Sequence, residues 1–301
     1  MKNTNAYIFP LLSIVFWSGN YVLGRITLNQ GMDPYTMSFL RWLLACAFLL
    51  PFTYKAILRE RQIIKDCLPL LILMGGLGVC NYNLFLYIAL TTTTVTNAVL
   101  LNSLMPILIM LVARILLGSR TSPLQNLGIA ISTIGAAVIV SRGSIDTLLH
   151  LTITHGDMWV VAAVSSWALY SVLLSKRPKA MSLYAFFSVT AIIGTLIQAP
   201  IYLAFGTHSV AELTANNWLV LLYMASFASI AAFICWNKGI EKIGPASAGH
   251  FIHLMPIFSV ALSIPLLGET LETFHLLGVI FILSGILTAT VLNNRIQRIQ
   301  N

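Results

Sequence analysis

The sequence is poor in charged residues. Asp, Glu, Lys and Arg make up only 9% of its 301 residues, while 58% are hydrophobic; in a soluble domain about a quarter of the residues are charged. The longest stretch outside an apolar run extends only from Arg142 to Gly156. These features exclude a soluble globular protein and leave no length for a domain outside a membrane.

The motifs of several functional classes are also missing. There is no GxxxxGK[ST] loop to hold nucleotide phosphates and no HExxH or GxSxG motif. The four cysteines show no CxxC or metal-ligand spacing, and no ring of charges typical of a channel filter is present. We therefore expect no nucleotide-driven pump, no enzyme, no metal and no cofactor. An intramembrane enzyme is retained only as the rival from another class.

The sequence does contain ten long apolar runs. A bilayer core about 30 Å thick is crossed by about 20 helical residues, so ten crossings fit a chain of 301 residues. The predicted spans are 8–27, 35–54, 68–88, 95–117, 124–141, 157–175, 182–204, 217–236, 245–266 and 273–293. We therefore predict an all-α integral membrane protein with ten transmembrane helices.

The basic residues between these spans indicate the orientation. With the N-terminus in the cytoplasm, 14 of the 17 Lys and Arg residues lie in inner loops, at an inner span end or at the termini, whereas Arg25 and Arg142 lie outside. Cytoplasmic loops are enriched in Lys and Arg, so both termini are predicted to be cytoplasmic, in a bacterial inner membrane. Because the basic residues form no continuous stripe or arm, the net charge of +8 does not indicate nucleic acid as a partner.

The chain repeats itself at an offset of 150 residues. LMPI occurs at 104–107 and at 254–257, LLG occurs at 116–118 and at 266–268, and Trp17 matches Trp167. The two units, 1–150 and 151–301, each hold five predicted spans, so the second unit enters the membrane from the opposite side. Inverted repeats surround a central site in many secondary transporters. We therefore predict two inverted five-helix repeats around a central cavity.

Longer motifs carry a family resemblance. FWSGNYVLGR at 16–25, FLRW at 39–42, the segment 93–106, GDMWVVAAVSSWALYSVL at 156–173 and the segment 243–269 resemble the drug/metabolite transporter superfamily, in its ten-helix branch with two EamA-type repeats. The resemblance covers essentially the whole chain and is specific to the superfamily, not to a substrate. It implies a ten-helix bundle with a central cavity and, in this branch, export of amino acids or related metabolites.

Polar residues within the fourth and ninth predicted spans are the first candidates for a site. Asn97 and Ser103 match Ser247 and His253 at the 150-residue offset, and His250 lies three residues before His253. A polar group in a bilayer is stable only when it faces the interior of the bundle or water, so we expect these side chains to line the cavity. A histidine there can take up a proton near neutral pH. The alternative is a histidine that only bonds within the bundle.

Aromatic and amide side chains of the first and sixth predicted spans are the second candidates. Trp17, Asn20 and Tyr21 lie on the first span, and Trp167 and Tyr170 lie on the sixth. Their flat apolar faces and polar tips suit an amphipathic or zwitterionic metabolite. Trp and Tyr also anchor helices at the membrane surface, which is the alternative role.

One arginine and two prolines complete the set of candidates. Arg41 lies about two turns inside the second span, where it can pair with a substrate carboxylate or extend outward to Asp33 or a lipid phosphate. Pro106 and Pro256 lie at equivalent depths, and each removes a helix hydrogen bond. Either a hinge or a static kink fits these prolines.

Together these patterns predict a secondary active transporter that exports amino acids or related small polar metabolites, with proton coupling left open. Import or exchange by a member of the same superfamily is the alternative, because topology does not fix the direction of net flux. The expected partners are a small-molecule substrate, the lipid bilayer and, where coupling applies, protons.

Overall fold

The computed structural model describes residues 4–93, 95–119, 121–150, 153–208, 210–267 and 272–292. Within these ranges ten helical segments are long and apolar enough to cross a membrane, and no strand is present. Each segment lies on one of the ten predicted spans, so the predicted all-α membrane bundle is confirmed. The largest difference is at the end of the eighth span, which was predicted to end at residue 236 and continues in the structure to Ile243.

Six of the ten described spans consist of one main α-helix each. They are α1 (Ile8–Asn29), α2 (Pro34–Arg59), α8 (Pro123–Val140), α10 (His155–Leu173), α11 (Leu183–Phe205) and α16 (Thr273–Leu287). Polar residues fix where several of them begin: the side chains of Asp33, Ser122 and Ser182 accept hydrogen bonds from the first turns of α2, α8 and α11. Such caps satisfy backbone N–H groups that have no partner inside the helix.

The other four described spans are interrupted. The third span is built from α4 (Leu68–Met74), the π-helical segment η2 (Gly75–Asn81) and α5 (Tyr82–Thr92), and the eighth from α12 (Ala215–Tyr223), the π-helical segment η5 (Met224–Ala231) and α13 (Ala232–Ile243). The fourth is built from α6 (Val95–Asn102) and α7 (Met105–Leu117), and the ninth from α14 (Pro245–Gly249), the 3-10 segment η6 (His250–Leu254) and α15 (Met255–Leu267).

The interruptions recur at the offset of the sequence repeat. Adding 150 to the bounds of η2 gives 225–231, which falls on η5, and adding 150 to the turn at Ser103 and Leu104 gives 253–254, which falls on η6. π-helical and 3-10 segments inside longer helices are frequent at hinges and functional sites. The irregular backbone therefore marks the same two places in each half of the sequence.

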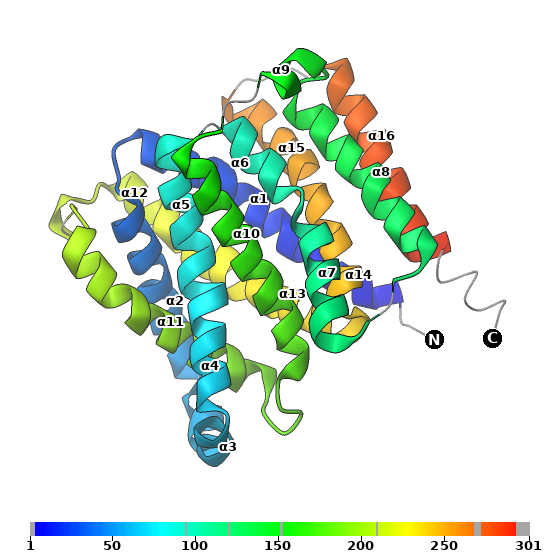
Figure 1. The fold of residues 1–301 in the computed structure, drawn as a ribbon. Coiled ribbons are helices and arrows are strands. Elements are labelled where there is room, and N and C mark those ends of the chain that lie inside the picture. Colours follow the sequence, from blue (N-terminus) through cyan, green and yellow to red (C-terminus); the bar gives the residue numbers. More distant parts are fainter. Residues whose placement is uncertain are drawn as a thin grey trace.

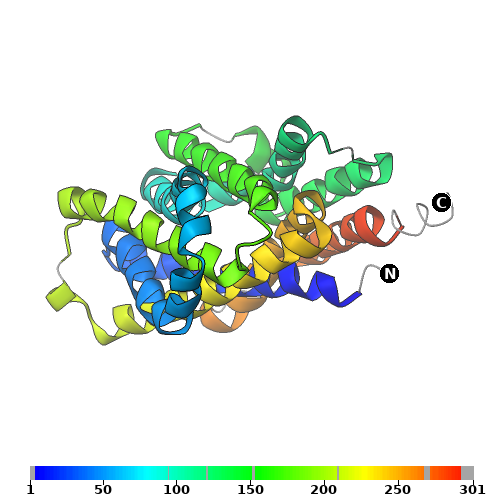
Figure 2. The ribbon, with the colours of Figure 1, turned by 90° about the horizontal axis from the view of Figure 1, so that it is seen from below.

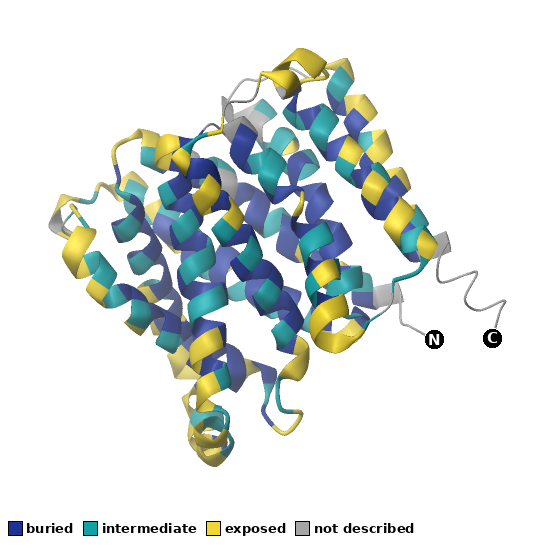
Figure 3. Cartoon of the chain, in the orientation of Figure 1, coloured by how far each residue is buried: buried dark blue, intermediate teal, exposed yellow. Residues whose placement is uncertain are grey.

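The bundle has two edges and a middle. Helices α8 and α16 pack side by side at one edge, α2 and α11 pack together towards the other, and α1 packs against α13 in the middle (Figure 1). The short helices α3 (Arg61–Asp66) and α9 (Ile145–Leu149) lie at opposite ends of the bundle (Figure 1). Seen from below, α8 and α10 lie on one face and α1 and α13 on the other (Figure 2). Buried residues fill the middle, whereas exposed residues collect on the outward sides of α3, α12 and α16 (Figure 3).

Glycines set the contact at the α8–α16 edge. A Cβ atom on Gly128 would lie 2.4 Å from the carbonyl oxygen of Gly285, and one on Gly135 would lie 2.7 Å from that of Gly278. The two backbones therefore touch directly, which is how small residues let membrane helices associate without a hydrophobic driving force.

Carboxylates tie both ends of α2 to α11. Oδ2 of Asp33 accepts hydrogen bonds from the backbone N of Thr207 at 3.1 Å and from Nδ1 of His208 at 2.9 Å, just after α11 ends. At the other end, Oε2 of Glu60 accepts from the backbone N of Ser182 at 2.8 Å, just before α11 begins. The two helices are thereby held in register at both ends.

Candidate functional site

The predicted site residues fall into separate clusters. The first is an aromatic cluster between α1, α10 and α13. The ring of Trp17 meets the ring of Trp167 edge to face at 5.0 Å, and Trp167 lies 5.2 Å from both Tyr170 and Phe233. The indole nitrogen of Trp17 donates to the carbonyl oxygen of Ala228 at 2.9 Å. The structure thus brings together Trp17, Trp167 and Tyr170 at the centre of the bundle, where their faces pack on one another.

The second cluster surrounds Arg41, whose side chain is fully buried. Its Nη1 atom donates to Oδ1 of Asn83 at 2.8 Å, to the hydroxyl of Tyr87 at 2.9 Å and to Oδ1 of Asn20 at 3.2 Å. Its Nε atom donates to the hydroxyl of Ser229 at 2.6 Å. Arg41 therefore binds side chains from α1, α5 and η5 at once.

The outward extension of Arg41 towards Asp33 or a lipid phosphate, one of the two alternatives for this residue, is not what the structure shows. Asp33 accepts hydrogen bonds from Thr36, Thr207 and His208 instead. The guanidinium has turned inward because five neutral oxygens within hydrogen-bond distance are offered there, and a desolvated cation needs acceptors on every side.

Two hydrogen bonds of the same kind occur at matching positions of the two sequence repeats. The hydroxyl of Tyr87 donates to Oδ1 of Asn20 at 3.2 Å, and the hydroxyl of Tyr170 donates to Oδ1 of Asn237 at 3.0 Å. Adding 150 to Asn20 gives Tyr170, and adding 150 to Tyr87 gives Asn237. The amide and the phenol have exchanged places, while the contact between the two positions is kept.

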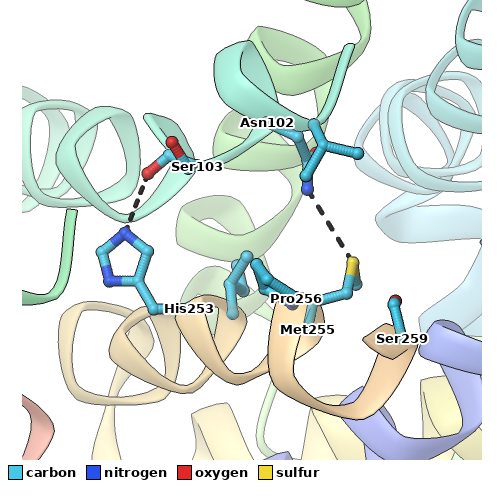
Figure 4. Close-up of a pocket in the computed structure, with 8 residues that line it drawn as sticks. Asn102, Ser103, His253, Met255, Pro256 and Ser259 are labelled. Carbon is cyan, nitrogen blue, oxygen red and sulfur yellow. Dashed lines mark hydrogen bonds between the residues drawn. The ribbon is translucent and has the colours of Figure 1, made fainter. Parts of the chain in front are cut away.

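The third cluster lies where the fourth and ninth spans are interrupted. Nε2 of His253 lies 2.8 Å from the carbonyl oxygen of Ser103, and Nδ1 lies 2.7 Å from the hydroxyl of Ser132 on α8. Figure 4 shows His253 pointing at Ser103, and Asn102 pointing at the sulfur of Met255 across a small pocket. The pocket has a volume of about 50 Å³, and its lining consists of Val99, Asn102, Ser103, Ile252, His253, Met255, Pro256 and Ser259.

The other candidates on these spans occupy different surroundings. His250 is buried, and neither of its ring nitrogens has a hydrogen-bond partner within the described ranges. Pro106 and Pro256 are the second residues of α7 and α15, directly after the interruptions. Proline is readily accommodated in the first turn of a helix, where its missing N–H is not needed. The helices therefore begin anew at the prolines and are not kinked in mid-course by them.

Asn97 and Ser103 do not face the same pocket. Nδ2 of Asn97 donates to Oδ2 of Asp157 at 3.1 Å, and these two residues line a separate groove of about 360 Å³ between α6 and α10. A helix turns about 100° per residue, so residues six apart differ by about 120° in direction. Residues three apart therefore share a face of the helix, whereas residues six apart, such as Asn97 and Ser103, do not. The side chain of Tyr21 lies outside the described residues.

Three contributors escaped the sequence analysis, namely Ser132, Ser229 and Asp157. Serines in apolar helices commonly bond their own backbone, so Ser132 and Ser229 gave no signal. Asp157 stands at the start of a span, where an acid is expected to act as a helix cap, and it does accept from the backbone N of Thr154 at 2.7 Å. Its further bonds to Thr93 and Asn97 depend on packing between helices.

Comparison with known proteins decides the family. The profile of the EamA-like transporter family matches residues 4–141 and again residues 154–291. The chain belongs to the EamA-like transporter family. The two matches of this EamA-like transporter begin 150 residues apart, as do the motifs of the sequence repeat.

Several transporters are similar to this EamA-like protein over nearly their whole length. The uncharacterized transporter YyaM of Bacillus subtilis is 27% identical, covering 96% of this chain and 95% of its own. A probable terminal-alkyne amino-acid exporter of Streptantibioticus cattleyicolor is 25% identical, with 95% and 94% covered, and a probable amino-acid metabolite efflux pump of Salmonella typhimurium is 26% identical, with 96% and 95% covered. A solved crystal structure superposes with a TM-score of 0.80 at 18% identity, covering 97% of this chain and 99% of that one, which shows the fold alone.

Proposed function

We propose that this EamA-like transporter is a secondary active exporter of amino acids or related small polar metabolites across a bacterial inner membrane, with both termini in the cytoplasm. The names of two relatives, an amino-acid exporter and an amino-acid metabolite efflux pump, support the substrate class and the direction. The distribution of 14 of 17 basic residues supports the orientation.

We further propose that the halves 1–150 and 151–301 are inverted repeats related by a two-fold axis in the membrane plane. Under such an axis, residues 150 apart can touch only near the axis itself. Trp17 touches Trp167, and His253 touches Ser103, which supports this arrangement. Each glycine contact at the α8–α16 edge likewise joins a residue of one matching pair to a residue of the other, 128 with 285 and 135 with 278.

The observation that carries the transport mechanism is the contact between the interrupted fourth and ninth spans. The pocket at this contact, at about 50 Å³, holds a few water molecules at most, whereas ligand sites have volumes of about 300–1,000 Å³. A substrate can pass only if α6 and α7 separate from η6 and α15. The turn at Ser103 and the 3-10 segment η6 supply backbone that can bend there, and Pro106 and Pro256 follow as the first turns of stable helices.

The bonding of His253 suits a proton carrier. Its Nε2 must carry a hydrogen in either charge state, because the carbonyl oxygen of Ser103 only accepts. When the ring is neutral, the hydroxyl of Ser132 donates to Nδ1; when the ring is protonated, Nδ1 donates to that hydroxyl, which can turn its hydrogen to the carbonyl oxygen of Gly128 at 2.8 Å. Both charge states of His253 are therefore satisfied without any movement of the backbone.

Counterflow in proteoliposomes tests the proposal. Purified protein is reconstituted, and uptake of a panel of radiolabelled amino acids is measured with and without a pH gradient. Two variants are compared, His253→Gln and His250→Gln; both lose a buried imidazole, but only the first loses the bonds to Ser103 and Ser132. We expect uptake of one class of amino acid, accelerated by the gradient in the wild type and in His250→Gln but not in His253→Gln.

The outcomes separate the parts of the proposal. Uptake that ignores the gradient in all three proteins would remove the proton from the mechanism and leave a facilitator or an exchanger. Loss of the gradient effect in His250→Gln alone would move the carrier role to His250. If no amino acid is taken up, the substrate class is wrong.

A further inference from the structure

The guanidinium of Arg41 is bound by the two halves of the chain on different edges. Nη1 is held by first-half side chains, those of Asn20, Asn83 and Tyr87. Nε and Nη2 point the other way and donate to second-half groups, the hydroxyl of Ser229 at 2.6 Å and the carbonyl oxygen of Ala228 at 3.2 Å. Nε and Nη2 form one edge of the guanidinium, the edge that binds a carboxylate through two parallel hydrogen bonds.

All acceptors around this cation are neutral. Among the described residues Arg41 takes part in no ion pair, although its side chain is fully buried. A buried charge is stable when it is paired and hydrogen-bonded, and neutral oxygens supply only the second condition. Beside it, Nδ2 of Asn83 and Nε1 of Trp42 are buried donors that have no hydrogen-bond partner among the described residues. The cluster therefore has an excess of donors and positive charge, and it lacks an anion.

The second-half acceptors are held by irregular backbone. Ala228 and Ser229 belong to the π-helical segment η5, and the carbonyl oxygen of Ala228 accepts from both Arg41 and Trp17. The position that matches Arg41 in the second half is Ala191, on α11. Only one half thus carries a cation at this depth, so the two halves cannot be equivalent towards a charged substrate.

We propose that Arg41 recognises the carboxylate of the substrate, which takes the Nε and Nη2 edge in place of Ser229 and Ala228 when the two halves separate. Nη1 stays bound to Asn20, Asn83 and Tyr87, and this keeps the edge aimed at the space that opens. The exchange replaces two neutral acceptors by an anion of matching geometry, so a substrate with a carboxylate favours the separated state. This inference rests on the proposed transport of amino acids and narrows its substrates to those with a free carboxylate.

Matched pairs of acid and amide test the inference in the wild type. Counterflow of leucine, phenylalanine and threonine is compared with that of leucinamide, phenylalaninamide and threoninamide, which keep the side chain and the amino group and lack the carboxylate. Truncating one partner of a buried, hydrogen-bonded charge pair weakens binding by about 30-fold or more, and we expect a preference of that size for the acids. Equal transport of acid and amide would overturn the inference and leave the proposed function intact.

Three variants then locate the preference. Arg41→Lys keeps the charge and loses the two-bond edge, and Arg41→Gln loses both. Ser38→Ala removes the hydrogen bond from Ser38 to Oε1 of Gln198 at 2.7 Å, a buried bond of α2 that does not involve Arg41. We expect the ratio of acid to amide transport to fall about tenfold in Arg41→Lys, to approach one in Arg41→Gln and to be unchanged in Ser38→Ala.

The ratio distinguishes recognition from a purely structural role. A structural role would lower acid and amide transport equally, so an unchanged ratio in Arg41→Lys would overturn the inference. If the Arg41 variants do not fold, the wild-type comparison still tests the inference, because equal transport of acid and amide would overturn it. If neither acids nor amides are transported, the proposed function falls, and this inference falls with it.

Discussion

The two amide–phenol pairs show how one arrangement can be used in two ways. Asn20 and Tyr87 bond to each other and also to a buried arginine, whereas Tyr170 and Asn237 bond to each other within a cluster of aromatic rings. The positions match at the 150-residue offset, but the surroundings are charged in one half and apolar in the other. The two halves thus keep the same contact between matching positions but surround it with different side chains. Such a difference suits a transporter whose two sides face different conditions.

Side-chain size differs between the two pairs in a compensating way. Tyr170 presses its ring against Gly78 in η2, and a Cβ atom on Gly78 would lie 2.4 Å from the ring. At the matching positions the first half has the smaller Asn20 in place of Tyr170, and the second half has the larger Ala228 in place of Gly78. The larger residue, Tyr170 of the second half, thus packs on the smaller neighbour, Gly78 of the first half.

The largest effect is expected from Gly78→Ala. The new methyl group would overlap three ring atoms of Tyr170, at 2.4 to 2.7 Å, and overpacking of this kind destabilises by about 3 kcal/mol. Thermal unfolding of the purified protein measures the change. The control is Gly76→Ala in the same segment, where the nearest atom lies 3.9 Å from the new Cβ; alanine is favoured over glycine in a helix, so its melting temperature should stay or rise. Equal losses in both variants would refute the role of Tyr170 in this contact.

How far the sequence predicted this molecule can be judged from such contacts. The ten spans follow from hydrophobicity alone, because a bilayer crossing demands a certain length of apolar helix. Trp17, Trp167 and Tyr170 were predicted within one set of cavity candidates, and the structure brings their rings together; their contact with a substrate stays a prediction. The direction of the Arg41 side chain was left open between two alternatives, because the sequence does not show that Asn20, Asn83 and Ser229 converge on it from three other helices.

The sequence patterns did not predict the irregular backbone segments. A proline in the sequence suggests a kink at its own position, yet the structure ends α6 at Asn102 and begins α7 at Met105, so that Pro106 lies in the first turn of a new helix. The π-helical segments η2 and η5 contain no proline, and they share no signal in composition, since η2 has three glycines among seven residues and η5 has none. They expose carbonyl oxygens to neighbouring side chains, as at Leu77 and Ala228, and this depends on packing that only the fold provides.

An intermediate effect is expected from removing the phenol hydroxyl in each pair. Tyr170→Phe takes away the only described partner of the Asn237 side chain, whose Nδ2 is already unpartnered. Leaving a buried polar group unsatisfied destabilises by about 2 kcal/mol. Tyr87→Phe leaves Asn20 bonded to Arg41, which also keeps its bonds to Asn83 and Ser229, so a smaller loss of about 1 kcal/mol is expected. Urea or thermal unfolding of both variants checks the order; a larger loss in Tyr87→Phe would mean that the charged pair, not the apolar one, depends more on its phenol.

The smallest effect concerns the clamps at the two ends of α2, and it fades in acid. Burial alone would raise the pKa of Asp33, but hydrogen bonds from Thr36, His208 and Thr207 lower it from 3.8 to about 2. Burial would likewise raise the pKa of Glu60, but hydrogen bonds from Ser182 and Arg59 outweigh this effect and lower the pKa. A group whose pKa is lower in the folded state stabilises the fold above its unfolded pKa and loses this contribution as the pH falls through the folded value.

Asp33→Asn should therefore lower the melting temperature at pH 6 and have less effect as the pH approaches 3, because the wild-type carboxylate loses its advantage between pH 3.8 and about 2. Thermal unfolding in detergent from pH 6 to pH 3 measures the difference between the two proteins. Asp66→Asn is the control, since Asp66 is an exposed carboxylate that bonds only Gln62 on its own short helix among the described contacts, and its curve should run parallel to that of the wild type. A constant gap between Asp33→Asn and wild type over this range would show that the loss does not depend on the ionisation of Asp33, and no gap at pH 6 would show that an asparagine can replace it as a helix cap.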